Sequence, residues 1–320
     1  MTPAHVLVTG GAGFIGSHIV DLLMERPDVR VTVVDKLTYA GSLENLALHE
    51  GADRLSFVQA DVADADAMRR VVAGVDHVVH AAAETFVDRS IADPGEFVRS
   101  NVMGTHSVLE ACRGSGVPVL SVSTDEVYGE GPQPPGAGLS EEDALAPRSP
   151  YAASKAAGAL LCRAYHVTYG LPVTLARGTN AYGPRQHPEK GLPTYAIAAL
   201  QSLPIPVYGD GRHRREWLFV TDFARAILAI MDRGERGGVY NIGGGFELEN
   251  RDLAVRICRL TGAPESLITS VPDRPGHDRR YGLRWERLRS LGWRPNVSFE
   301  DGLARTVEWY RERLAAGVSP

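Results

Sequence analysis

The chain has 320 residues, of which 44% are hydrophobic and 23% are charged, so it can bury one large core or two modest ones. Its net charge of −5, and the lack of any apolar run near the roughly 20 residues that span a bilayer, give no basis for binding nucleic acid or a membrane. Three scattered cysteines in apolar surroundings, and a start with no basic region or cleavage site, predict buried thiols, no metal site, no signal peptide and a cytoplasmic protein.

The first predicted elements are a strand, a glycine-rich turn and a helix. Residues 5–9 form a continuous apolar strand, which is typical of a sheet covered on both faces. Gly10 would allow a tight turn, and Gly13 would let backbone N–H groups approach a pyrophosphate at the start of the helix. Gly16 would let that helix pack closely on the strand. This spacing is typical of a dinucleotide-binding turn.

The second strand, residues 31–35, ends in a carboxylate. Asp35 stands at about the spacing expected for the acid that binds the ribose diol of a dinucleotide. A carboxylate would repel the 2′-phosphate of NADP, so Asp35 favours NAD. The neighbouring Lys36 argues weakly in the other direction.

Two further strands end at residues suited to a ligand. Residues 55–59 lead to Asp61 and Val62, a place where an acid can meet the adenine, and residues 76–80 lead to the small side chains of Ala81 and Ala83. Strands that alternate with helices over this length predict an α/β fold with a doubly wound parallel sheet.

The strand at residues 119–124 ends in a hydroxyl and two adjacent carboxylates, Thr124, Asp125 and Glu126. Burying an unpaired carboxylate is costly, and open α/β sheets bind ligands beyond the carboxyl ends of their strands. The two carboxylates therefore predict a cleft. The alternative is a simple turn, because Ser-Thr-Asp-Glu is also a fair helix-capping sequence.

A loop and a helix follow this strand. Residues 130–148 are rich in proline, glycine and acids without periodicity, which predicts a surface loop over the cleft that could act as a lid. The next helix places Tyr151 and Lys155 on one face, at positions i and i+4. The charge of Lys155 could lower the phenol pKa of Tyr151 and make it a base near neutral pH.

The regular alternation of strands and helices changes beyond Leu171. We predict a dinucleotide-binding Rossmann domain over residues 1–172, which also receives about 215–242, and a smaller C-terminal α/β substrate domain made mainly of 173–320. Residues 212–217 and 273–281 are two basic clusters in an otherwise acidic protein. Guanidinium groups fit phosphate bidentately, so the clusters suggest a pocket for an anionic, nucleotide-like substrate. For 212–217, the alternative is a solvated loop.

Taken together, these motifs resemble the extended short-chain dehydrogenase/reductases. More closely, they resemble the nucleoside-diphosphate-glucose 4,6-dehydratases, with dTDP-glucose as the expected substrate. Relatives that only epimerise or decarboxylate usually lack the Asp125–Glu126 pair. The resemblance runs from Val6 to about Tyr310, and its most specific segments are 87–90, 123–129, 149–155, 182–184, 188–190 and 273–278.

The resemblance implies an NAD-dependent hydro-lyase that forms a 4-keto-6-deoxy sugar. Tyr151, supported by Lys155, would take the O4 proton while hydride leaves C4 for NAD, and Thr124 would hydrogen-bond the O4 region. Glu126 would then remove the C5 proton, and Asp125 would protonate the departing 6-hydroxyl. The stored hydride would return to C6.

The resemblance also implies contact residues and partners. NAD would contact Gly10, Gly13, Phe14, Ile15, Gly16, Asp35, Lys36, Asp61, Val62, Ala81, Ala83, Tyr151 and Lys155. The nucleoside-diphosphate sugar would contact Glu84, Thr85, Asn180, Arg215, Asn250, Arg274 and His277. The protein would be a homodimer that pairs the helix carrying Tyr151 and the helix near 102–112 across a two-fold axis.

The sequence departs from the dTDP-glucose enzymes at 83–86, 177–182 and 283–285, where the sugar or nucleotide would sit. Arg177 resembles the residue of epimerase and decarboxylase relatives. The alternative is therefore a nucleoside-diphosphate-sugar 4-epimerase or a hexuronate oxidase/decarboxylase, which would use Tyr151 and NAD but leave the two carboxylates idle. A non-catalytic NAD-binding sensor or scaffold would predict loss of Tyr151 or Lys155, and both are present.

Overall fold

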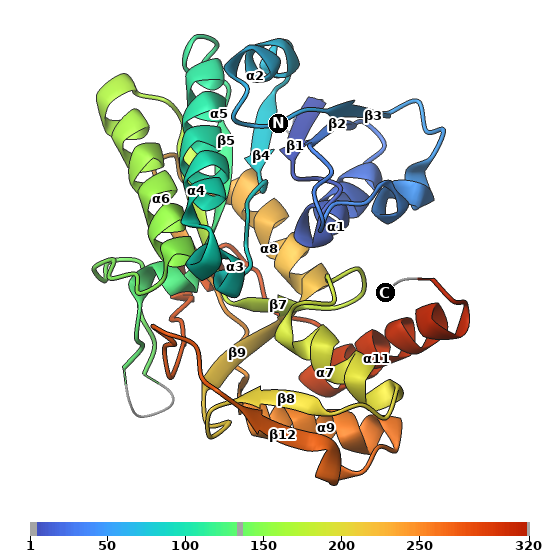
Figure 1. Cartoon of the computed structure of the whole chain (residues 1–320). Helices are drawn as coiled ribbons and strands as arrows, with labels where there is room; N and C mark the ends of the chain where they lie inside the picture. Colours follow the sequence, from blue (N-terminus) through green and yellow to red (C-terminus); the bar gives the residue numbers. More distant parts are fainter. Residues whose placement is uncertain (1–4, 133–136, 319–320) are drawn as a thin grey trace.

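The computed structural model describes residues 5–132 and 137–318, which form a larger part built on a parallel sheet and a smaller part below it (Figure 1). The predicted lid loop at 130–148 contains residues 133–136, which lie outside the described residues. Within the described ranges, no helix is both long and apolar enough to cross a membrane. The three cysteines are buried and form no disulfide, as predicted.

The larger part confirms the doubly wound sheet. Its seven strands are all parallel and run in the order β10-β6-β5-β4-β1-β2-β3. Successive strands are added outward on both sides of β1 and β4, so the winding direction reverses between these two and leaves a crevice for a ligand at their carboxyl ends. The strands are β1 (His5–Thr9), β2 (Arg30–Asp35), β3 (Leu55–Gln59), β4 (His77–His80), β5 (Val119–Thr124), β6 (Val173–Gly178) and β10 (Val239–Ile242).

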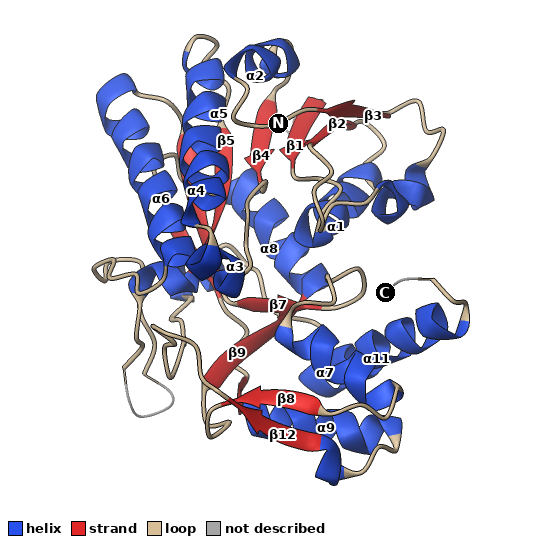
Figure 2. Ribbon diagram, in the orientation of Figure 1, coloured by secondary structure: helices blue, strands red, loops and turns tan. Residues whose placement is uncertain are grey.

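Helices cover both faces of this sheet (Figure 2). Val6 and Val8 of β1 point to the face covered by α1 and α8, while Leu7 points to the face covered by α2, α5 and α6. All three side chains are fully buried, which explains the continuous apolar run. The helices are α1 (Phe14–Met24), α2 (Ala65–Val72), α3 (Val87–Ala92), α4 (Pro94–Phe97), α5 (Gly104–Arg113), α6 (Pro150–Tyr169) and α8 (Val220–Arg233), with short turns η1 (Leu43–His49), η2 (Val98–Met103) and η3 (Asp125–Tyr128).

The smaller part has a three-stranded sheet, β11-β9-β7, and a two-stranded sheet, β12-β8. An aromatic core holds it together, in which the ring of Tyr182 contacts those of Trp217, Phe219 and Phe299. Its elements are β7 (Asn180–Tyr182), α7 (Gly191–Leu200), β8 (Ile205–Tyr208), β9 (Arg214–Phe219), β11 (Glu247–Glu249), α9 (Asn250–Thr261), η4 (Glu265–Leu267), β12 (Ile268–Val271), α10 (Glu286–Ser290) and α11 (Phe299–Ala315).

Several segments differ from the sequence-based expectations. The chain is still part of the large sheet just after residue 172, because β6 pairs with β5. For the basic segment 212–217, the alternative of a solvated loop is wrong, because most of it is strand β9, with Arg215 buried against its neighbours. The helix expected from Asn101 begins inside the π-helical turn η2, which joins α4 to α5.

Candidate active site

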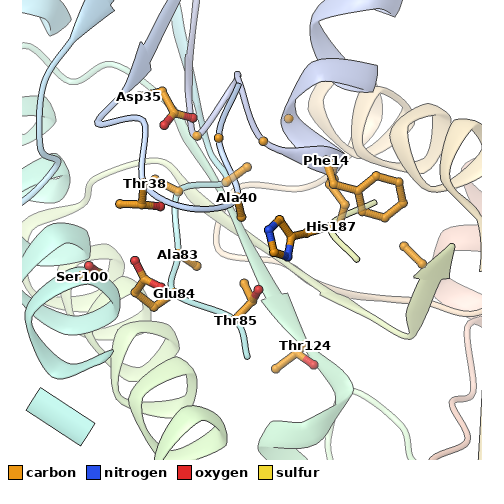
Figure 3. Close-up of a pocket in the computed structure, with 18 of the residues that line it drawn as sticks. Phe14, Asp35, Thr38, Ala40, Ala83, Glu84, Thr85, Ser100, Thr124 and His187 are labelled. Carbon is orange, nitrogen blue, oxygen red and sulfur yellow. The ribbon is translucent and has the colours of Figure 1, made fainter. Parts of the chain in front are cut away.

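A cavity of about 280 Å³ opens at the carboxyl ends of the central strands (Figure 3). In the close-up, Asp35 lies at one end beside the glycine turn and Thr124 lies at the other. The cavity brings together seventeen of the predicted residues, namely Gly10, Gly13, Phe14, Ile15, Gly16, Asp35, Lys36, Val62, Ala81, Ala83, Glu84, Thr85, Thr124, Asp125, Glu126, Tyr151 and Asn180.

The glycine turn leaves room that a side chain would fill. Gly10 has φ +69°, and a Cβ there would lie 2.6 Å from the Cα of Ala82. A Cβ on Gly16 would lie 2.0 Å from the carbonyl oxygen of Gly10, so the helix packs directly on the turn. Gly13 caps α1 without a side-chain hydrogen bond. The first N–H groups of α1 are therefore available to an anion such as a pyrophosphate.

Asp35 is fixed by the backbone around the turn. Its carboxylate accepts hydrogen bonds from the backbone N–H groups of Ala12 at 3.1 Å and Leu37 at 2.9 Å. Burial raises the pKa of Asp35, while these two hydrogen bonds and the charge of Lys36 lower it. The side chain is rigidly placed on the wall of the cavity, where a ribose diol could donate to it.

Lys36 is surrounded by acids. Its ammonium lies 4.0 Å from Asp61, 3.8 Å from Glu84 and 3.7 Å from Glu96. These carboxylates offset the positive charge of Lys36, which had been a weak argument for NADP over NAD. Asp61, which was expected to contact the cofactor, is not among the cavity-lining residues; its carboxylate accepts from Arg99 at 2.8 Å and from a backbone N–H.

The carboxylate pair satisfies both sequence-based interpretations. Thr124 caps the turn η3, accepting from the N–H of Glu126 at 3.3 Å, and donates to Asp125 at 3.1 Å. Both carboxylates nevertheless line the cavity. Asp125 is only 3% exposed, and its Oδ2 has no hydrogen-bond partner among the described residues. The turn η3 thus places both carboxylates on the wall of the cavity.

The two carboxylates have different electrostatic surroundings. Burial, followed by the charge of Glu126, raises the pKa of Asp125 to about 8. Burial also raises the pKa of Glu126, but the cations of Arg274, Arg215 and Lys190 pull it down again. Asp125 is therefore the neutral acid near pH 7 and Glu126 the better candidate for an ionised base.

Tyr151 lies beside this pair on α6. Its ring packs edge-on against Phe97 at 6.3 Å between centroids. Burial and then the charge of Glu126 raise the pKa of Tyr151, and a hydrogen bond with Thr124 lowers it. The direction is opposite to the one expected from Lys155. Burial and the charge of Glu126 decide this direction. The ammonium of Lys155, whose pKa burial lowers to about 8, donates at 2.8 Å to the carbonyl of Val122.

The basic clusters meet next to the carboxylates. Arg215 lies 2.7 Å from Nε2 of His277, and both Arg215 and Arg274 lower the pKa of Glu126. Asn250, which begins α9, donates its N–H to the carbonyl of His213, whose ring stacks on His277. These residues do not line the cavity itself. Arg215 and Arg274 place positive charge on the side of Glu126, which suits an anionic ligand.

One cluster of metal-ligand type occurs in the part of the chain that the structure describes, formed by His213, Asp273 and His277. Arginine has no acceptor, so the contact with Arg215 requires Nε2 of His277 to accept. The proton of His277 is then on Nδ1, 2.7 Å from Asp273. A metal at Nδ1 would displace this arrangement, and nearby arginines disfavour a cation, so the geometry does not favour a metal.

Sequence reasoning missed the loop before α7. Gln186, His187, Glu189 and Lys190 all line the cavity, as do residues of the turn after β2 and Ser100. Lys190 donates to the carbonyl of Thr85 at 2.7 Å, and burial lowers its pKa to about 8. The loop has no periodicity that marks it, and only the family-like motif at 188–190 could have drawn attention to it.

Arg177, the departure that favoured an epimerase, is not part of the cavity wall. It is buried, donates to the hydroxyl of Tyr128 at 2.7 Å and lies 4.9 Å over that ring. Tyr128 in turn donates to Asn241 at 2.8 Å. Arg177 therefore supports the turn that carries the carboxylates from behind, and its presence says little about the substrate.

Comparison with known proteins places this geometry among characterised relatives. Residues 6–243 match the family model described as NAD dependent epimerase/dehydratase family. The chain is 48% identical over 317 residues to the dTDP-glucose 4,6-dehydratase of Streptomyces niveus, covering 97% of this chain and 94% of that protein.

Solved structures give the same picture. The dTDP-glucose 4,6-dehydratase of Streptomyces venezuelae, solved with NAD and TYD bound, has a TM-score of 0.94 and 48% identity and covers 98% of both chains. The UDP-glucose 4-epimerase of Thermus thermophilus, solved with NAD, has a TM-score of 0.88 and 36% identity and covers 96% of this chain and 99% of that one. Backbone similarity alone therefore does not separate dehydratase from epimerase.

Proposed function

The chain belongs to the NAD dependent epimerase/dehydratase family, and from this premise we propose that it is an NAD-dependent hydro-lyase that converts dTDP-glucose to its 4-keto-6-deoxy product. One observation carries the proposal beyond family membership. Asp125 and Glu126 line the same cavity as Tyr151 and the glycine turn; burial raises the pKa of both, to about 8 for Asp125, and three nearby cations oppose the rise at Glu126. Only a dehydratase needs both an acid and a base beside that tyrosine.

The residues around the turn fit NAD. Gly10 and Gly16 leave a cradle that a Cβ would fill, the N–H groups at the start of α1 suit the pyrophosphate, and Asp35 suits the ribose diol. Bound NAD supplies the hydride acceptor for C4 and the hydride donor for C6. Lys36, matched by three carboxylates, leaves little free charge for a 2′-phosphate.

Tyr151 is assigned to the first proton transfer. Its phenol lies at the wall of the cavity with the hydroxyl of Thr124 beside it. In the oxidation it would accept the proton of the sugar O4 as the C4 ketone forms. Because burial holds its pKa high, the positive charge that accompanies bound NAD and the ammonium of Lys155 would have to oppose Glu126.

Asp125 and Glu126 are assigned to the loss of water. The new ketone acidifies the C5 proton, which ionised Glu126 removes. The C6–O bond breaks as neutral Asp125 gives its proton to the departing hydroxyl, so water leaves and a C5–C6 double bond forms. The two groups exchange protonation states, which is why one has to start protonated and the other ionised.

Product analysis tests this function. The protein is incubated with dTDP-glucose, UDP-glucose, UDP-N-acetylglucosamine and UDP-glucuronate, with deuterium at C4, and the products are identified by NMR. Deuterium at C6 of a 4-keto-6-deoxy product from dTDP-glucose is the expected result. A 4-epimer that keeps deuterium at C4, or a pentose from the uronate, would instead establish one of the alternative reactions.

The rate of elimination should depend on pH through the carboxylate pair. Asp125 has a pKa raised to about 8, so it holds its proton at neutral pH and loses it, and with it the acid function, as the pH rises further. On the acid side the rate should fall as Glu126, whose pKa burial also raises, becomes protonated. The two groups titrate as a pair, so the profile should be a bell. A rate of water loss that stays constant to about pH 10 would contradict these roles.

We also propose that the protein is a homodimer in which α5 and α6 pair with their copies. Leu160 and Val167 on α6 are 55% and 74% exposed, and Met103, the last residue of η2 just before α5, is 51% exposed. Exposed large apolar side chains on α6 and just before the neighbouring helix α5 support an interface there. Light scattering at micromolar concentration should give a dimer, and Leu160→Glu with Val167→Glu should give a monomer. Leu260→Glu, on α9, is the matched control. A monomeric parent protein would refute the proposal.

We further propose a cytoplasmic location and a division of the chain into two domains. The unpaired, buried cysteines support a cytoplasmic location, because reducing compartments keep thiols free. We also propose an NAD-binding domain over residues 1–172 that receives about 215–242, and a substrate domain made mainly of 173–320. The return of α8 and β10 to the large sheet supports this division, with β6 joining the NAD-binding side.

A further inference from the structure

Residues 184–190, between β7 and α7, border the cavity, and we call this segment the strap. Four of its seven side chains line the cavity, namely Gln186, His187, Glu189 and Lys190. In Figure 3 the ring of His187 projects toward the middle of the cavity, between the labelled residues Ala40 and Thr85. The strap comes from the smaller part of the molecule but lines a cavity built largely by the residues after the strands of the large sheet.

The first end of the strap is fastened to α1, the helix that begins at the glycine turn. Arg185 donates to Asp21 at 2.7 Å, and the ring of His18 donates to the carbonyl of Pro184 at 3.1 Å. Burial lowers the pKa of His18 to about 4, so this contact is a neutral hydrogen bond. Arg185 has φ +70°, an unfavourable conformation for a residue with a side chain, which the ion pair helps to hold.

The second end is fastened to α3 and to the turn after β2. Arg89 donates its Nε–H to Glu189 at 2.9 Å, and its guanidinium lies 3.8 Å over the ring of Tyr39. Tyr39 also meets His187 edge-on, with 5.3 Å between ring centroids. Lys190 adds the hydrogen bond to the carbonyl of Thr85. Segments that are distant in sequence are thus joined at the cavity.

From these contacts we propose that the strap retains the cofactor, with Arg89 and Asp21 as its positioning residues. The proposal rests on the proposed function, because a dehydratase returns its hydride to the substrate in every cycle and has no need to exchange NAD. Neither Arg89 nor Asp21 lines the cavity. They act through the strap, which has to come free at one end before a molecule held beneath it can leave.

The two fastenings differ in exposure, which identifies the end that opens. The side chains of Arg185 and Asp21 are 15% and 20% exposed, whereas in the second pair Glu189 is 13% exposed and Arg89 is 49% exposed. Exposed ion pairs are weaker and are screened by salt. The Arg89 end is therefore the one that opens, and release of the cofactor should become faster at high salt.

Arg89→Ala tests the proposal. The variant loses the ion pair and the contact with Tyr39, and bound NAD should dissociate about tenfold faster than from the parent protein. The measurement is the exchange of bound NAD for labelled NAD in excess, together with NAD content after gel filtration. Arg256→Ala is the matched control, because Arg256 is also exposed, pairs with Glu300 at 2.8 Å and lies 5.9 Å over the ring of Phe246, away from the cavity.

The outcomes separate the strap from the function. A parent protein that binds no NAD at all would refute the cofactor assignment itself. A parent protein that holds NAD while Arg89→Ala exchanges it at the parental rate would refute the strap. Asp21→Asn weakens the other end and gives a second, independent measurement, with faster exchange again expected. If both variants and the Arg256→Ala control exchange NAD equally faster, the effect is general destabilisation and the strap is refuted.

Discussion

Changing Asp125 to Asn and Glu126 to Gln together should leave oxidation at C4 intact and lower the rate of water loss by about 10³-fold or more. Both amides keep the size of the acids they replace, so the turn capped by Thr124 should remain folded. Neither amide can take the C5 proton or protonate the leaving hydroxyl. The reaction should therefore stop after oxidation at C4, with the 4-ketone formed and the cofactor left reduced.

Rapid-quench analysis with C4-deuterated dTDP-glucose measures this result. Absorbance of the reduced cofactor should rise within one turnover and stay high, while no 4-keto-6-deoxy sugar accumulates. The single variant Asp125→Asn is the informative comparison, because it retains the base and removes only the neutral acid whose pKa is raised to about 8. Full dehydration by the double variant would exclude these roles for the pair.

The second large effect is expected for Tyr151→Phe, which should slow oxidation at C4 by about 10² to 10⁴-fold. The phenyl ring keeps the edge-on contact with Phe97, so the change removes a proton acceptor and little packing. Because elimination needs the ketone, water loss should fall by the same factor. Single-turnover appearance of the reduced cofactor reports the oxidation directly.

Tyr165→Phe provides the control for this variant. Tyr165 lies on the same helix, α6, but its hydroxyl donates to Glu110 far along the helix from the cavity. Loss of the Tyr165 hydroxyl should leave the rate of oxidation at C4 near that of the parent protein. If Tyr151→Phe oxidised C4 at the parental rate, another group would have to accept the O4 proton, and the assignment of Tyr151 would be wrong.

The sequence predicted those parts of the site that local patterns encode. The run at Val6 to Val8 is apolar at every position because both faces of the sheet are covered. Gly16 is required by its contact with Gly10 within the turn, and Gly10 by its contact with Ala82, which follows the neighbouring strand β4. Asp125 and Glu126 could be placed in a cleft because a parallel strand ends just before them. In each case, the reason for the residue lies nearby in the chain or in the order of the elements.

The parts that were missed depend on distant contacts. Glu189 matters to the cavity through Arg89, one hundred residues earlier, and no pattern within the strap reveals this pairing. The pKa of Tyr151 is raised by burial and by the charge of Glu126, and the sequence alone shows neither how deeply the phenol is buried nor that Lys155 donates to a carbonyl of β5. A solvated loop stayed open as an alternative for strand β9 because its arginines look exposed, although Arg215 is buried among polar partners.

The support behind the carboxylate turn has a consequence for protein engineering. Arg177 of β6, Tyr128 of the turn and Asn241 of β10 form one buried hydrogen-bonded chain, to which Glu141 adds an acceptor for the N–H of Asn241. Grafting the Thr-Asp-Glu segment into a relative that lacks these hydrogen-bonded residues would transfer the reactive acids without the contacts that fix their position. The smallest set of residues that can be transferred as a working unit is therefore discontinuous in sequence, and it includes three strand ends and a loop.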